Sequence, residues 1–171
     1  IEEIGTAEGL SPDEMEITKL AGWFNYLGFR DLKAFKNIDN PKSLFMNCAQ
    51  CSVQIAKEYL EKKEYPQEKI TQVIDVMESG GTNMFTPNSK MANVLSDAVT
   101  AYIGKSKSRK NIELLYQEFL LTDVITESKS GFYENAITYV TTHSYLTEYA
   151  REHFVPTKLK LIQKLEKRKK A

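Results

Sequence analysis

The sequence predicts an all-α protein, a bundle of about seven helices. Apolar residues recur at intervals of three and four along most of the chain, which is the period of a helix with one buried face. Prolines and glycines mostly stand between these segments, as in Tyr65-Pro66 and Gly80-Gly81, where they can begin or end a helix. No segment alternates apolar and polar residues for long enough to compete as a strand.

The first well-defined helix is predicted to begin at Ser11. Ser11 is a good N-cap, Pro12 suits the first helical position, and Glu14 completes a capping box. Gly28 is expected to end this helix, and a polar loop is expected over residues 30–42. The predicted buried face consists of Ile17, Leu20, Ala21 and Phe24.

The middle of the chain predicts three more helices. The helix over residues 43–63 is amphipathic, the next opens at Pro66 and stops at Gly80, and a third is capped by Asn88 and ends at Gly104. Residues 82–87 are expected to connect the last two. In the helix over residues 43–63, the residues predicted to face inward are Cys48, Cys51, Ser52, Ile55, Tyr59 and Lys62.

The C-terminal part predicts helices over residues 108–124, 130–142 and 146–169. Pro156 is expected to interrupt the last of them, because proline has no backbone N–H to donate. The basic end of that helix, residues 156–171, is expected to form a solvated face along its lysine run.

Length and composition predict one globular domain over residues 1–171 that buries a core without disulfides or metal staples. Lys and Arg number 23 and Asp and Glu number 23, so no global field attracts nucleic acid and no such partner is expected. No apolar run approaches the roughly 20 residues that span a bilayer, and no leader opens the chain. We therefore expect a cytoplasmic chain with no membrane span of its own.

The two cysteines, Cys48 and Cys51, are interpreted as small core residues on one helix face. A structural zinc site needs about four ligands, and the histidines, His143 and His153, lie far along the chain. A thioredoxin-type motif needs a strand that leads into the helix, and none is predicted here.

The order of several segments resembles that of the HD-domain superfamily of metal-dependent phosphohydrolases, which are helical proteins. The resemblance extends over nearly the whole chain. It is most similar to a small bacterial branch in which the HD domain is often fused to a membrane-embedded effector that responds to cyclic nucleotides. The segments that resemble the family are residues 10–14 with 20–24, 48–52, 65–70, 96–98 with 103–104, and 139–154.

The resemblance implies that the family's metal-binding residues have been replaced. The histidine-aspartate pair would fall on Asn25 and Tyr26, a histidine-glutamate pair on Cys48 and Ala49, and the late aspartate on Asp97. An amide oxygen, a protonated phenol and a lone carboxylate cannot replace the imidazole and carboxylate ligands of a catalytic ion. We therefore expect no catalytic residue and no bound metal, and we expect Asn25, Tyr26, Cys48 and Asp97 to line a vestigial pocket.

Two functions remain open on these grounds. The preferred one is a pseudoenzyme that acts as a binding or regulatory module for a small phosphorylated ligand or nucleotide, for a second copy, or for a fused effector tethered through residues 156–171. The chain would then lack the start of its first helix, whose tail is Ile1–Ile4. The alternative is an active phosphohydrolase or phosphodiesterase on nucleotides, with a non-standard site for a divalent transition metal such as manganese or iron.

Three features of the sequence also have purely structural interpretations. Asp97 is expected to accept hydrogen bonds from helix ends or from Asn25 and Tyr26, as buried polar groups usually do. His143 is expected to be a packing residue. The aromatic residues Tyr139, Tyr145, Tyr149 and Phe154 are expected to form core and rim.

Overall fold

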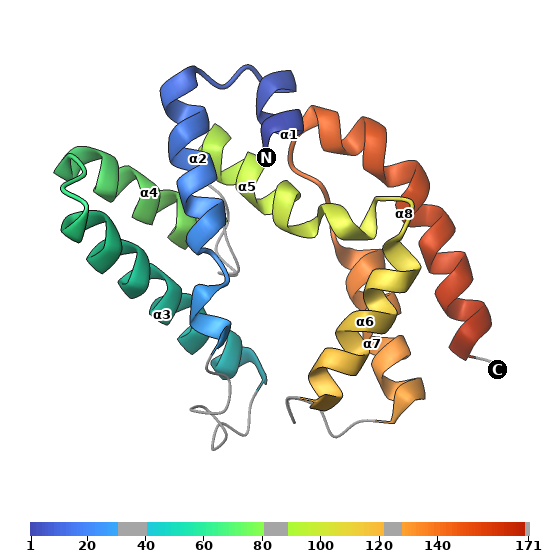
Figure 1. The fold of residues 1–171 in the computed structure, drawn as a ribbon. Coiled ribbons are helices and arrows are strands. Elements are labelled where there is room, and N and C mark those ends of the chain that lie inside the picture. Colours follow the sequence, from blue (N-terminus) through green and yellow to red (C-terminus); the bar gives the residue numbers. More distant parts are fainter. Residues whose placement is uncertain (31–40, 81–88, 122–127, 170–171) are drawn as a thin grey trace. The chain divides into compact units, whose positions relative to one another are not determined.

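The computed structural model describes residues 1–30, 41–80, 89–121 and 128–169 (Figure 1). Within these ranges the secondary structure is helical and no strand is assigned, which confirms the all-α prediction. None of the helices in these ranges is at once long enough and apolar enough to cross a bilayer. The helices are α1 (Glu2–Ala7), α2 (Pro12–Phe24), α3 (Pro41–Lys62), α4 (Gln67–Gly80), α5 (Lys90–Thr100), the 3-10 helix η2 (Ala101–Ile103), α6 (Ser108–Leu121), α7 (Lys129–Thr142) and α8 (Glu148–Lys169).

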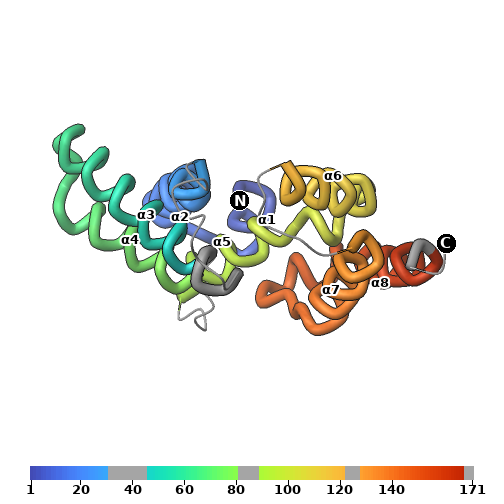
Figure 2. Tube along the Cα trace, turned by 90° about the horizontal axis from the view of Figure 1, so that it is seen from below, coloured from blue at the N-terminus to red at the C-terminus, as the bar shows by residue number. Residues whose placement is uncertain are grey.

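The backbone divides into two compact units, Ile1–Val99 and Thr100–Ala171. The single domain expected from the chain length stays a prediction. In the first unit α2 packs against α3 and α4, and α3 and α4 run side by side (Figure 2). Their shared core consists of Ile17, Ala21, Phe24, Ala56, Leu60, Ile70, Val73, Val76, Met77 and Leu95.

The predicted capping box at the start of α2 is confirmed. The Glu14 backbone N–H donates to Ser11 Oγ over 3.3 Å, and the Ser11 N–H donates to Glu14 Oε2 over 2.8 Å. The prediction that Gly28 ends the helix is wrong, because α2 ends at Phe24 and residues 27–30 form a 3-10 turn.

Gly28 has a different role, which is to allow close approach to α3. A Cβ on Gly28 would lie 2.0 Å from the carbonyl oxygen of Cys48 and 2.7 Å from the backbone nitrogen of Ser52. The Gly28 N–H donates to Ser52 Oγ over 2.8 Å, and Ser52 Oγ donates to the Cys48 carbonyl over 3.0 Å. The turn after α2 is therefore joined directly to the backbone of α3.

The helix predicted over residues 43–63 is present as α3, which begins two residues earlier, at Pro41, within the segment predicted as loop. Its buried face was predicted only in part. Tyr59 is 49% exposed and Lys62 is also exposed. The buried side chains of α3 recur every four residues, on the face that packs against α4 and α2. From residue 46 onward, where the side chains of α3 are described, the buried residues are Cys48, Ala49, Ser52, Ala56 and Leu60.

A left-handed residue ends α3 and turns the chain into α4. Glu64 has a φ of 56°, the Tyr65 N–H donates to the Leu60 carbonyl over 3.1 Å, and the Glu64 N–H donates to the Glu61 carbonyl over 3.0 Å. This is the Schellman arrangement, which usually places glycine at the left-handed position. The predicted helix between Pro66 and Gly80 is confirmed as α4.

The cap of α5 is Ser89, whose Oγ accepts a hydrogen bond from the Ala92 N–H over 3.1 Å. The predicted cap, Asn88, and the predicted connector over residues 82–87 lie outside the described residues. The α-helix ends at Thr100 and the chain continues as η2, with Gly104 as its C-cap, so the segment predicted to reach Gly104 is in two parts.

In the second unit α6, α7 and α8 pack on one another. The three predicted helices are present, and the part of the first that was expected beyond Leu121 lies outside the described residues. The predicted interruption at Pro156 is wrong, because α8 runs through it. Pro156 and Glu152 are exposed, so water can solvate the Glu152 carbonyl that loses its intrahelical partner. The prediction that Lys158 lies on a solvated face is also wrong, because it is 8% exposed.

Candidate functional site

The segment after α2 contains the first two predicted site residues, and the structure separates them. Asn25 is the C-cap of α2 and is 3% exposed, whereas Tyr26 is 49% exposed. The ring of Tyr26 meets the ring of Phe29 edge to face, with centroids 5.5 Å apart. Tyr26 therefore presents much of its side chain to solvent, while Asn25 faces the interior of the first unit.

The side-chain nitrogen of Asn25 is a buried donor. Among the residues that the structure describes, Asn25 Nδ2 has no hydrogen-bond partner. An unsatisfied buried polar group costs about 1–3 kcal/mol, and most such groups in native proteins find a protein or water partner. The amide therefore has a donor that an acceptor other than the described residues, such as a water or a ligand oxygen, can satisfy.

Cys48 is fully buried on α3, and the prediction that it is a core residue is confirmed. Burial raises the pKa of its thiol, and the nearby Cys51 raises it further. Both cysteines are free, and Cys51 is half-buried. A buried thiol with a raised pKa stays protonated near neutral pH and reacts slowly.

Asp97, the fourth predicted site residue, is fully buried on α5. Leu95, on the same helix, belongs to the core that Phe24 and Ala56 share. The structure therefore buries Asn25, Cys48 and Asp97 within one unit, and the hydrogen bonds of Gly28 and Ser52 join the segment of Asn25 to that of Cys48.

Within the described part of the chain, no group of three or more His, Cys, Asp or Glu side chains is placed to hold a metal ion.

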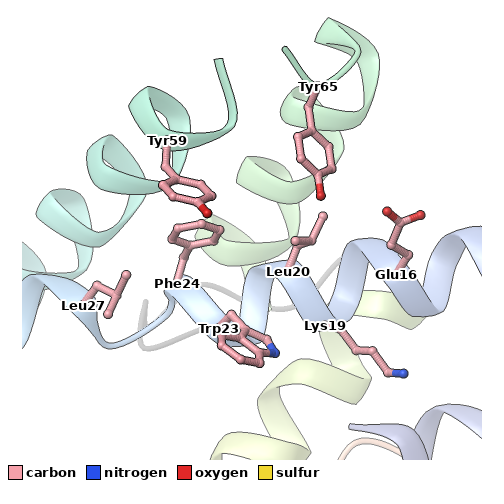
Figure 3. Close-up of a pocket in the computed structure, with 8 residues that line it drawn as sticks. All are labelled: Glu16, Lys19, Leu20, Trp23, Phe24, Leu27, Tyr59 and Tyr65. Carbon is pink, nitrogen blue, oxygen red and sulfur yellow. The ribbon is translucent and has the colours of Figure 1, made fainter. Parts of the chain in front are cut away.

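A surface groove in the first unit was missed by the sequence analysis. It has a volume of about 460 Å³, and none of the four predicted site residues lines it (Figure 3). Trp23 is its most exposed member, with 82% of the side chain accessible. The sequence contained a sign of this groove, because Trp23 and Leu27 are large apolar residues that lie outside the predicted buried face of the helix that begins at Ser11. The apolar lining consists of Leu20, Trp23, Phe24, Leu27, Tyr59 and Tyr65, and Glu16 and Lys19 supply the charged end.

The second unit contains a part-buried polar cluster around His143, the C-cap of α7. His143 Nε2 lies 3.0 Å from Thr100 Oγ1, and Tyr145 Oη donates to the Thr100 carbonyl over 3.5 Å. The Lys158 ammonium donates to the His143 carbonyl, and burial lowers the pKa of Lys158. The expectation that His143 is a packing residue is confirmed, since its ring meets that of Tyr145 at 4.6 Å.

Comparison with known protein families, curated proteins and solved structures finds no match for this chain. The resemblance to HD-domain phosphohydrolases therefore stays a prediction.

Proposed function

We propose that this chain is a binding module on a helical scaffold similar to that of HD-domain phosphohydrolases, and that it has lost their metal chemistry. The observation that supports this most directly is the state of Cys48, at a position where the family is expected to have a ligand. Its thiol is fully buried and its pKa is raised. Because the thiolate is the form that binds metals, a protonated buried thiol is a poor ligand.

The proposed ligand is a nucleotide, and two buried groups support this choice. Asn25 Nδ2 offers a donor with no partner among the described residues, which suits a phosphate or carbonyl oxygen. Asp97 offers a buried carboxylate, which suits a ribose hydroxyl or a base amino group. A nucleotide supplies acceptors and donors of both kinds.

A thermal-shift screen of nucleotides tests the binding step. A nucleotide at 100 times its dissociation constant stabilises the protein by about 2.7 kcal/mol, which corresponds to a rise in Tm of roughly 5–10 °C for a chain of this size. The shift is expected to disappear in Asn25→Leu, which removes the donor at similar volume, and in Asp97→Asn. It should persist in the matched control Asn111→Leu, which lies on α6 in the second unit. A flat response of the wild type to every nucleotide would contradict the proposal.

Metal analysis and hydrolysis assays test the loss of chemistry. The purified protein is expected to retain no transition metal and to turn over no nucleotide in manganese, magnesium or cobalt. Bound metal together with turnover that disappears in Asp97→Asn would overturn the proposal and favour the active phosphohydrolase.

The basic end of α8 is proposed as the tether to a further module. What supports this is the continuity of α8, which remains helical through Pro156 to Lys169. Leu161 and Leu165 are buried in the second unit, while Lys164 and Lys167 are exposed. A continuous helix anchored in this way would pass a displacement of one module to the next.

A further inference from the structure

The last helix, α8, presents a row of lysines on one side. Its buried residues recur at intervals of three and four through Pro156, so the helix keeps one register along its length (Figure 1). Those buried residues are Ala150, Phe154, Lys158, Leu161 and Leu165. Lys160, Lys164 and Lys167 follow one another at intervals of four and three, and all three are exposed. They form a lysine row about 10 Å long beside the buried face.

The charge of the lysine row is not balanced by its surroundings. Neighbours on a helix surface are three or four residues apart, and no acidic residue stands at those intervals from Lys160, Lys164 or Lys167. None of the three has an ion pair with another residue that the structure describes. Like charges at these intervals repel one another and destabilise a helix. A bound polyanion would remove this repulsion, so the row favours an anionic partner.

An aromatic pair lies on the same side of α8, nearer its start. His153 precedes Lys160 by seven residues, or two turns of helix, which puts the two residues on one side. The His153 ring stacks on that of Tyr149, with centroids 4.1 Å apart and an angle of 12° between the planes. Tyr149 is half-buried and also meets Phe154 edge to face, whereas His153 is exposed. The stack therefore holds an exposed ring in line with the lysine row, and a planar base can stack on such a ring.

Nucleic acid suits this side of α8 better than an anionic lipid surface does. Binding to a membrane grows with the apolar area that enters it, and the apolar face of α8 is already buried in the second unit. Leu159 is 56% exposed, but it lies midway between Glu152 and Glu166, at intervals of seven residues. Insertion of Leu159 would bring these two exposed carboxylates against the lipid phosphates. Cations in line with an aromatic ring are instead the combination that binds single-stranded nucleic acid.

We propose that this side of α8 binds single-stranded nucleic acid. Lys160, Lys164 and Lys167 contact backbone phosphates, and a base stacks on the His153 ring. Both kinds of contact are independent of base identity, so binding tolerates differences in sequence. The chain has 23 basic and 23 acidic residues and no global field, so the attraction depends on this local row. The row belongs to the second unit and does not require the nucleotide proposed for the first.

The salt dependence of binding tests the role of the lysine row. The full chain is titrated with a fluorescent single-stranded oligonucleotide of about 12 nucleotides, within the range of known site sizes. Three phosphate contacts predict a slope of about −2 when the logarithm of the binding constant is plotted against the logarithm of the salt concentration. The affinity should then fall by roughly 20-fold between about 50 and 200 mM salt.

Single variants separate the phosphate contacts from the stacking. Lys164→Gln should weaken binding by about 5-fold in about 0.1 M salt and reduce the slope by about 0.7. Lys164→Arg keeps the charge and should bind like the wild type. The matched control is Lys57→Gln on α3, because Lys57 is also exposed, and it should change neither the affinity nor the slope. His153→Ala should weaken binding by at least about 5-fold and leave the slope unchanged.

Vesicles of phosphatidylcholine and phosphatidylserine supply the competing anionic surface. A wild type that binds these vesicles and not the oligonucleotide overturns the proposal, as does one that binds neither. Equal effects of Lys164→Gln and Lys57→Gln would show general attraction instead of a contact with the lysine row, and would also overturn it. An unchanged affinity in His153→Ala removes the stacking contact that distinguishes nucleic acid from other polyanions, with the same consequence.

Discussion

Replacement of Gly28 by alanine is expected to open the contact between the turn after α2 and α3. The new Cβ would lie 2.0 Å from the Cys48 carbonyl oxygen and 2.9 Å from Cys51 Cβ. The closest obstacle is backbone, so it cannot rotate aside as a side chain would. An ordinary contact of 3.4 Å requires the turn to move by about 1.4 Å.

That movement has two costs. Overpacking a well-packed site costs about 1–3 kcal/mol. The hydrogen bond from the Gly28 N–H to Ser52 Oγ, 2.8 Å long, would also stretch beyond its useful range, and a buried unsatisfied donor costs about 1–3 kcal/mol. We therefore expect Gly28→Ala to destabilise the first unit by roughly 2–6 kcal/mol.

The buried thiol of Cys48 provides the assay, because it reacts only when this contact opens. In a Cys51→Ala background, which keeps the Cβ at residue 51, the rate of Cys48 labelling under native conditions measures the free energy of opening. A loss of 2 kcal/mol or more corresponds to labelling at least about 30 times faster in Gly28→Ala.

The control variant is Ser52→Ala, which removes the hydrogen bonds without the steric clash. It should cost about 1–2 kcal/mol and accelerate labelling by about 5- to 30-fold, less than Gly28→Ala. If Gly28→Ala labels at the wild-type rate, the close approach of the two backbones is wrong. If the two variants are equal, the steric part of the reasoning fails.

Glu64→Gly should stabilise the protein by about 1 kcal/mol in chemical denaturation, because Glu64 has a φ of 56°. Gly9→Ala should destabilise the protein by about the same amount, because Gly9 has a φ of 69° and nothing lies within 4 Å of the new Cβ. Destabilisation by Glu64→Gly together with stabilisation by Gly9→Ala would refute the strain argument. Lys158→Met should remove one contribution to the pH dependence of stability. Burial lowers the pKa of Lys158 in the folded state, so the charged ammonium destabilises the fold at pH values below that folded pKa. The stability of the wild type relative to the variant should therefore rise as the pH increases through the folded pKa towards 10.5. A flat difference in denaturation midpoint across that range would contradict this. Glu14→Gln should reduce the loss of stability at acid pH. The hydrogen bonds to Ser11 lower the pKa of Glu14 in the folded state, and the stability they contribute is lost as the pH falls from 4.5 through that folded pKa. Equal loss of stability in both proteins under acid denaturation would argue against it.

The sequence predicted the features that depend on local interactions. The capping box at Ser11 and Glu14 needs only residues three positions apart, and the helix that ends at Gly80 needs only a period of apolar residues. The predicted burial of Cys48 was correct for the same reason, because small apolar side chains in an amphipathic helix usually face the core.

The features that depend on tertiary contacts were not predicted. Tyr59 and Leu60 are adjacent and both apolar, and only the position of α4 and α2 decides that Leu60 is buried while Tyr59 lines a groove. Lys158 belongs to a lysine run that reads as solvated, yet its ammonium reaches a helix-end carbonyl. Gly28 was interpreted as a helix end, because the approach of another backbone leaves no mark in the sequence.

The segment from Trp23 to Gly28 joins the surface groove to the buried interior of the first unit. Trp23 lines the groove, Phe24 packs in the core and also lines the groove, and Asn25 turns inward. Gly28 then holds the whole turn to α3. A nucleotide that accepts a hydrogen bond from Asn25 would therefore act only two residues from Trp23, the most exposed residue of the groove. If the nucleotide binds one arrangement of this turn better than another, the population of that arrangement rises, and the fluorescence of Trp23 would report binding without any catalytic step.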